Sequence, residues 1–174
     1  MNATGLRLLA LGAASALLLA ACTGDGGASP PVPSPGSDVA APLDFTTTEL
    51  GGGEVAGPEL AGSDTVLWFW APWCASCRAE APEVVEAAAA FDGSVEVIGV
   101  PGKGDRSEME GFVADTGSEG LRHLVDEDGG IWRSFGVIGQ PAFAFVDDDG
   151  TVEVFNGGLG FDALTERMAE LSAD

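Results

Sequence analysis

Basic residues are scarce in this chain of 174 residues. It contains 7 Lys+Arg against 28 Asp+Glu, and Lys103 is its only lysine. The formal net charge of −21 would repel the phosphate backbone of a nucleic acid, which argues against nucleic-acid binding. The excess of acid indicates solubility and repulsion from anionic surfaces.

Side chains that bind metals are also few. His123 is the only histidine, and the only cysteines are Cys22, Cys74 and Cys77. A structural zinc site usually needs a second cysteine pair. The acidic run 147–149 resembles a calcium loop, but calcium loops need a longer array of ligands. We therefore expect no metal cofactor and assign this run to a turn.

The one long apolar stretch lies close to the N-terminus. Residues 8–21 are apolar or small and follow the basic Arg7. These 14 residues are fewer than the roughly 20 of a transmembrane helix and match the core of a signal peptide. The stretch ends in Leu-Ala-Ala-Cys at Cys22, which resembles the lipobox of bacterial lipoproteins. We expect residues 1–21 to be a lipoprotein signal peptide and Cys22 to be lipidated; an ordinary signal peptide is the alternative.

The next segment, residues 22–41, has the composition of a disordered linker. It is rich in Pro, Gly and Ser and holds almost no large apolar residue. Residues 42–174 are long enough for one globular domain with a core. Removing residues 1–21 takes away Arg7 and no acid, which leaves 6 basic and 28 acidic residues and a net charge of −22.

Hydrophobic patterning predicts an α/β domain. The continuous apolar run 65–70 is typical of a strand buried on both faces, and a helix is expected from Cys74 to about Phe91. The other predicted elements are a strand pair within 44–53, a strand at 95–100, a helix from Asp105 or Ser107 to Asp115, a strand at 121–125, a short helix at 130–135, a hairpin of strands 143–146 and 152–155 turning at Asp-Gly, and a helix at 162–171. This order predicts a mixed central sheet with helices on both faces and a C-terminal hairpin plus helix.

Two cysteines mark the junction of the buried strand and the first long helix. Cys74 and Cys77 are separated by Ala-Ser, so they lie one helical turn apart on the same face. Such a pair can open and close as a disulfide, which indicates redox chemistry. A permanent structural disulfide is the alternative, although closing so small a ring would contribute only about 2 kcal/mol.

The motif Trp-Ala-Pro-Trp-Cys-x-x-Cys-Arg-x-Glu-x-Pro at 70–82, together with Phe-Gly-Val-x-Gly-Gln-Pro at 135–141 and the Asp-Gly hairpin, resembles the thioredoxin superfamily. More narrowly, it is similar to the TlpA/ResA/DsbE-like branch of membrane-anchored or secreted thiol–disulfide oxidoreductases, and most of all to secreted DsbE-like proteins of actinobacteria. The resemblance implies a thioredoxin-like fold over most of the domain.

The resemblance also implies roles for individual residues. Cys74 would be the exposed nucleophile and Cys77 the buried resolving thiol, in agreement with the stabilisation of a thiolate at a helix N-terminus. Pro141 would follow a cis peptide bond, and Gln140 would offer its backbone to a substrate. Trp73, Gln140 and Pro141 would form the substrate-binding edge.

Glu80 is the third candidate catalytic residue. Thioredoxin proper has a buried aspartate six residues before its first cysteine, whereas this chain has Trp68 there. Glu80 lies three residues after Cys77 on the same helical face, so a half-buried carboxyl with a raised pKa would shuttle the proton of Cys77. A solvated surface glutamate is the alternative.

These inferences predict an extracytoplasmic, lipid-anchored thiol–disulfide oxidoreductase. It would act on thiols and disulfides of exported proteins and be recycled by a membrane redox partner, with the Cys74–Cys77 disulfide in place of a separate cofactor. We expect oxidation; the alternative is a reductant for cytochrome c maturation or disulfide correction. A copper metallochaperone that uses His123 with the cysteines is a further, less favoured hypothesis.

Overall fold

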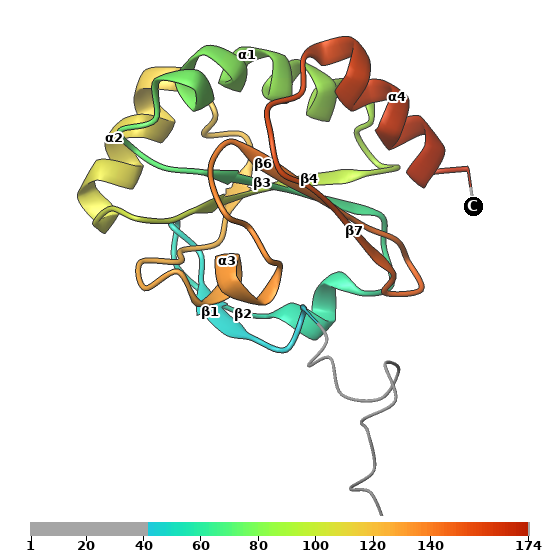
Figure 1. Ribbon diagram of the computed structural model, residues 1–174, viewed down its shortest axis with the longest axis horizontal. Helices are drawn as coiled ribbons and strands as arrows, with labels where there is room; N and C mark the ends of the chain where they lie inside the picture. The colour runs from blue at the N-terminus through green and yellow to red at the C-terminus, as the bar shows by residue number, and fades with distance from the viewer. Residues whose placement is uncertain (1–41, 174) are drawn as a thin grey trace, which may run out of the picture. The chain divides into compact units, whose positions relative to one another are not determined.

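The computed structural model describes residues 42–173 (Figure 1). The predicted signal peptide at 1–21, the lipidation of Cys22 and the linker at 22–41 lie outside these residues. The elements, in chain order, are β1 (Thr46–Thr48), β2 (Glu54–Ala56), the 3-10 turn η1 (Gly57–Leu60), β3 (Thr65–Trp70), α1 (Ala75–Ala90), β4 (Glu96–Pro101), α2 (Arg106–Thr116), β5 (Arg122–His123), α3 (Gly130–Ser134), β6 (Ala142–Val146), β7 (Val152–Phe155) and α4 (Phe161–Leu171).

A five-stranded mixed sheet forms the centre of the domain. Its strand order is β5-β4-β3-β6-β7; β3 runs parallel to β4 and antiparallel to β6, while β1 and β2 form a separate antiparallel pair. The predicted mixed sheet with a C-terminal hairpin and helix is confirmed. Each residue of β3 is buried, as its continuous apolar run indicated.

Helices cover both faces of this sheet. Figure 1 shows α1, α2 and α4 on one face and α3 with the β1–β2 pair on the other. Alternate residues of β3 supply the two cores: Trp68 and Trp70 point into the first, while Leu67 and Phe69 point into the second. No helix within residues 42–173 combines the length and apolar character needed to cross a membrane.

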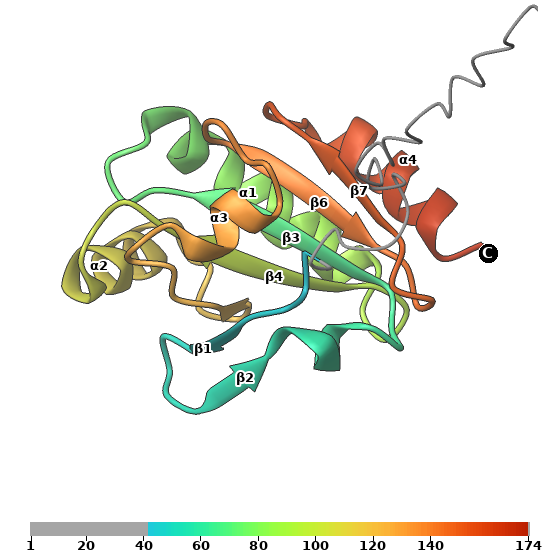
Figure 2. The same ribbon diagram turned by 60° about the horizontal axis from the view of Figure 1, so that its bottom comes forward.

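The strand predicted at 121–125 is shorter in the structure. Only Arg122 and His123 form the regular ladder with β4. The chain then stays beside β4, since the amides of Leu124 and Asp126 donate to the carbonyls of Gly99 and Pro101 at 2.8 Å and 2.9 Å. It also bonds the N-terminal strands, and Figure 2 shows the β1–β2 pair next to this edge of the sheet. The amide of Val125 donates to the carbonyl of Thr48 at 2.9 Å, and Leu124 bridges Glu49. These bonds join segments that are far apart in sequence, so no local sequence pattern predicts them.

One predicted helix cap and one predicted hairpin turn are present in the structure. Asp105, rather than Ser107, caps α2, and its carboxylate accepts the amide of Glu108 at 2.9 Å. The β6–β7 hairpin closes with the amide of Asp147 donating to the carbonyl of Thr151 at 2.9 Å. The run 147–149 therefore belongs to a turn, as predicted.

Candidate functional site

The two cysteines lie where β3 leads into α1. Cys74 is the N-cap of α1 in an extended backbone conformation, and Cys77 lies one turn inside the helix. They form a disulfide, with their Cα atoms 5.3 Å apart. The amide of Cys77 donates to Sγ of Cys74 at 3.1 Å. A negative charge on this sulfur after reduction would be stabilised by that amide and by the positive end of the helix dipole.

The cysteines differ in burial, but less than expected. Cys77 is fully buried, whereas Cys74 keeps 4 % of its surface exposed. The prediction that Cys74 is exposed was wrong in degree, because the side chain packs into the core cluster of Trp70 and Ala71. The order was right, since Cys74 is the member of the pair that retains contact with solvent.

The half-buried carboxyl of Glu80 is held by two hydrogen-bond donors. Nε1 of Trp68 donates to Oε2 of Glu80 at 3.0 Å, and the amide of Leu159 donates to Oε1 at 2.7 Å. Burial raises the pKa of Glu80 to about 7, although both hydrogen bonds act to lower it. The solvated surface glutamate is excluded, because this carboxyl is half-buried. Trp68, which replaces the aspartate of thioredoxin, thus orients a different acid.

Two segments lie beside the dithiol, and we call them the walls of the site: residues 71–73, which precede Cys74, and residues 138–141, the cis-proline wall. The peptide bond between Gln140 and Pro141 is cis, as the resemblance implied. Phe69 of β3 pairs with Ala142 of β6, so Pro141 lies at the end of β3 from which the chain leads to Cys74. The sheet therefore brings the predicted proline to the dithiol from a distant part of the sequence.

Two large apolar side chains are exposed beside these walls. Trp73, which precedes Cys74, is 62 % exposed, and Ile138, which precedes the cis-proline segment, is 87 % exposed. The amide of Ile138 donates to Oδ1 of Asn156 at 3.1 Å. Trp73 was predicted; Ile138 was not, although an isoleucine between turn-forming glycines at 136 and 139 was a signal for an exposed loop.

A glycine-rich loop separates Glu80 from Pro141. A Cβ atom on Gly158 would lie 2.8 Å from Oε1 of Glu80 and 3.3 Å from Cγ of Pro141. Glu80 and the cis-proline thus face the same short stretch of backbone between β7 and α4. Sequence reasoning missed this loop, because a run of small residues has no chemistry of its own.

His123 lies away from a metal-binding arrangement. It is buried, and its Nε2 lies 3.0 Å from the carbonyl oxygen of Ser118. Burial lowers the pKa of His123, so the ring is neutral and Nε2–H donates to that carbonyl. Within residues 42–173, no cluster of metal-ligating atoms joins this histidine to Cys74 and Cys77.

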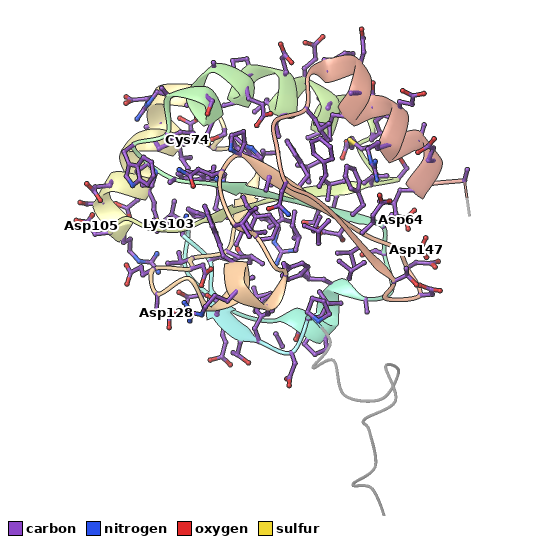
Figure 3. All side chains as sticks on the ribbon, in the orientation of Figure 1. Asp64, Cys74, Lys103, Asp105, Asp128 and Asp147 are labelled. Carbon is purple, nitrogen blue, oxygen red and sulfur yellow. A yellow bond between two sulfur atoms is a disulfide. The ribbon has the colours of Figure 1, made fainter. Side chains whose placement is uncertain are left out.

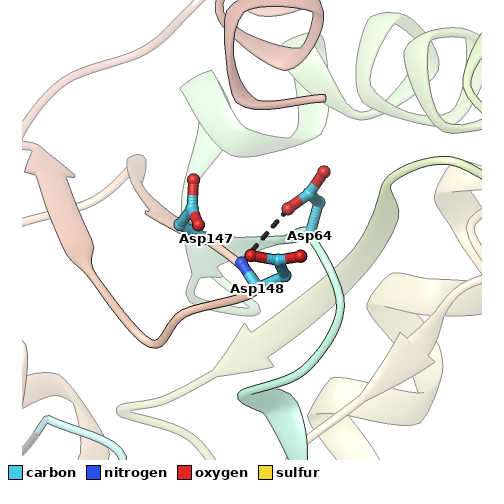
Figure 4. Close-up of side chains that lie close together, drawn as sticks. All are labelled: Asp64, Asp147 and Asp148. Atoms are coloured by element: carbon cyan, nitrogen blue, oxygen red, sulfur yellow. Dashed lines mark hydrogen bonds between the residues drawn. The ribbon is translucent and has the colours of Figure 1, made fainter. Parts of the chain in front are cut away.

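The described residues do contain one acidic cluster. Carboxylate oxygens of Asp64, Asp147 and Asp148 lie within 4.8 Å of one another (Figure 4), and the amide of Asp148 donates to Oδ1 of Asp64 at 3.2 Å. Asp64 and Asp147 are half-buried, and Asp148 is exposed. Asp64 precedes β3 and the other two follow β6, whereas the dithiol follows β3; Figure 3 shows Asp64 and Cys74 at opposite ends of the sheet. We attribute the cluster to the geometry of the hairpin turn.

Comparisons with known proteins agree with this geometry. The profile described as the AhpC/TSA family matches residues 38–155. The soluble secreted antigen MPT53 of Mycobacterium tuberculosis is 39 % identical over 134 residues, which cover 75 % of this chain and 76 % of that protein.

Two solved structures from M. tuberculosis are also similar. The structure of dsbF in mixed oxidised and reduced forms has a TM-score of 0.73 and 42 % identity, and covers 77 % of this chain and 99 % of its own. A secreted disulfide oxidoreductase homologous to E. coli DsbE has a TM-score of 0.69 and 39 % identity, and covers 75 % of this chain and 98 % of its own.

Proposed function

Because the chain belongs to the AhpC/TSA family and its relatives include secreted DsbE-like oxidoreductases, we propose that it oxidises dithiols of exported proteins outside the cytoplasmic membrane. The chain is a thiol–disulfide oxidoreductase with a thioredoxin-like fold. The observation that carries the proposal is the Cys74–Cys77 disulfide at the N-terminus of α1, facing the cis-proline wall.

Oxidation proceeds in two exchanges. A substrate thiol loses its proton to solvent, and its thiolate attacks Sγ of Cys74; a mixed disulfide forms and Cys77 leaves as a thiolate. The second substrate thiol then loses its proton, and its thiolate attacks the substrate sulfur of the mixed disulfide, which releases Cys74 as a thiolate. After both protein thiolates take up protons, the substrate has lost two electrons and two protons and the protein has gained them.

Glu80 supplies the proton that Cys77 needs. With a pKa of about 7, a substantial fraction of this carboxyl is protonated near neutral pH, so it can donate to the Cys77 thiolate and regain a proton from solvent. Its position three residues after Cys77 on α1 supports this role. In the reductive direction, the same carboxylate would remove the proton from Cys77.

The substrate would lie along the cis-proline wall. The backbone of Gln140, just before β6, offers groups that an extended substrate chain can pair with as an added strand. Trp73 and Ile138 provide exposed apolar surface for side chains near the reacting cysteine. Strand pairing of this kind recognises the backbone of the substrate, and the side chains beside the site add selectivity.

The direction of electron flow is tested by the reduction potential. We expect the oxidised domain, equilibrated with glutathione buffers, to have a potential nearer to about −120 mV than to about −270 mV. The reduced fraction would be counted by thiol alkylation and mass spectrometry. A potential at or below about −270 mV would contradict the oxidase assignment and support the reductant, because the protein would then donate electrons.

We further propose that Cys22 carries a lipid anchor and that a membrane redox protein reoxidises the Cys74–Cys77 dithiol. Diacylation anchors a chain more firmly than one acyl group does. Replacing Cys22 with alanine in the full chain should move the protein from the detergent phase to the aqueous phase of a phase-separation assay. A Cys77→Ala control should stay in the detergent phase; an aqueous partition of the wild type would refute anchoring.

A further inference from the structure

The loop after β4 contains a lysine in an unusual backbone conformation. Lys103 has φ of 58° and is the only non-glycine residue with a positive φ within residues 42–173. This left-handed conformation is unfavourable for residues with a Cβ, and glycine adopts it without cost. A non-glycine residue kept there is an observed outlier from which a functional role of its side chain can be inferred.

The flanking glycines show how closely the loop is packed. A Cβ on Gly102 would lie 2.8 Å from the indole of Trp132, and a Cβ on Gly104 would lie 2.7 Å from Cγ of Pro72. The backbone on either side of Lys103 is thus fixed between α3 and the segment that precedes the dithiol. Lys103 itself is exposed, and Figure 3 shows it on the same side of the domain as Cys74.

Lys103 contacts both walls of the site. Its carbonyl oxygen accepts a hydrogen bond from Nε1 of Trp73 at 2.9 Å, and its Nζ donates to Oε1 of Gln140 at 3.3 Å. The same Nζ lies 4.5 Å from the ring centroid of Trp132, a cation–π contact. One residue therefore joins the tryptophan before Cys74 to the glutamine before Pro141.

The charge of this lysine is not neutralised by an ion pair. Among the described residues, the ion pairs involve four arginine contacts and none from Lys103. The nearby carboxylate of Asp105 is engaged in capping α2. In a chain with net charge −21, the only ammonium side chain thus lies beside the substrate-docking walls.

We propose that Lys103 is a positioning and specificity residue of the exchange reaction. Its backbone carbonyl holds Trp73 and its ammonium group holds Gln140 in place. The ammonium group also favours substrates with a carboxylate next to the reacting cysteine. This inference rests on the proposed function, since it concerns how that same site selects its substrate. Attraction between the ammonium and a carboxylate about 7 Å away corresponds to roughly a fivefold difference in rate at an intermediate effective dielectric.

The test uses three otherwise identical cysteine peptides in which Glu, Gln or Lys flanks the cysteine. Their rates of reaction with the oxidised full chain would be measured at 0.15 M salt, where the long-range field of the acidic protein is screened beyond about 8 Å. The wild type should react roughly fivefold faster with the Glu peptide than with the neutral Gln peptide, and more slowly still with the Lys peptide, which the ammonium repels. Lys103→Gln should remove this preference, and Lys103→Arg should retain most of it.

Two controls separate a specific role from structural damage. Arg133→Gln removes an exposed charge that binds the carbonyl of Asp128 and contacts neither wall, so it should keep the preference. Lys103→Gly removes the side chain and relieves the left-handed backbone, so it should lose the preference without a lower Tm. 2-Mercaptoethanol, which needs no docking surface, should react equally with all variants.

The outcomes distinguish the two proposals. Reaction of the wild type with all three peptides at equal rates would overturn the role of Lys103 while leaving the oxidoreductase intact. Retention of the Glu preference in Lys103→Gln would overturn it as well. Reaction with none of the peptides would overturn the proposed function, and the assignment of Lys103 with it.

Discussion

Replacing Cys74 with serine is expected to reduce thiol–disulfide exchange by more than about 10³-fold, because a hydroxyl cannot take part in disulfide formation and the reaction has no other route. The Cys77→Ser variant should behave differently. Its Cys74 thiolate attacks a substrate disulfide, but no resolving thiol remains, so the mixed disulfide accumulates. Mass spectrometry under non-reducing conditions should detect an adduct that dithiothreitol releases.

Stability provides a check on this comparison. Both variants lose the same small ring, whose closure contributes about 2 kcal/mol, so they should unfold at similar denaturant concentrations. Cys22→Ser is the matched control, because it removes the third cysteine and leaves the dithiol intact. Failure of Cys77→Ser to form an adduct, or adduct formation by Cys74→Ser at an equal level, would contradict the assignment of Cys74 as nucleophile.

Replacing Glu80 with glutamine should change both exchange and the pH dependence of stability. Loss of the proton donor for Cys77 should lower the exchange rate by about 10²-fold and remove the inflection near pH 7 from its pH profile. Glu86→Gln, an exposed change on the same helix, should leave both unaffected. A pH profile of Glu80→Gln that keeps the wild-type inflection would refute the proton-transfer role.

The sign of the stability effect follows from the raised pKa. Between the ordinary value of 4.5 and the folded value of about 7, folded Glu80 binds more protons than unfolded Glu80 does. The free energy of unfolding therefore falls as pH rises through this range and stays lower above it. The full shift corresponds to about 3 kcal/mol, which we reduce to about 2 kcal/mol because the carboxyl is only half-buried.

Denaturant titrations at pH 5 and pH 8 would measure this effect. The wild type should lose about 2 kcal/mol more than Glu80→Gln between the two values. His123, whose lowered pKa gives the opposite slope below its ordinary value of 6.5, is present in both proteins and cancels in the comparison. Equal losses in the two proteins would contradict a buried, titrating Glu80.

Local sequence signals were sufficient for the dithiol and the elements that carry it. The apolar run of β3 and the one-turn spacing of the cysteines depend on neighbours in sequence, and both were confirmed. The cis-proline was also predicted, but only through the family resemblance. The degree of burial of Cys74 was not, because it depends on how distant segments pack around α1.

The parts of the site that sequence reasoning missed are contacts between distant segments. Leu159 reaches Glu80 across 79 positions, and Lys103 reaches Gln140 across 37. A backbone amide and a lone lysine carry no periodic pattern, so only the folded chain shows what they bind. The bonds around β5 are of the same kind, since the amide of Val125 donates to the carbonyl of Thr48, 77 positions earlier in the chain.

The loop between β7 and α4 links the cis-proline wall to Glu80. At one end Asn156 binds the amide of Ile138, and three residues later the amide of Leu159 binds Glu80. If a bound substrate chain displaces the cis-proline wall, either the hydrogen bond between Ile138 and Asn156 breaks or the loop moves with the wall. In the second case the movement reaches Leu159 and so changes the hydrogen bond to Glu80, the carboxyl with a pKa of about 7.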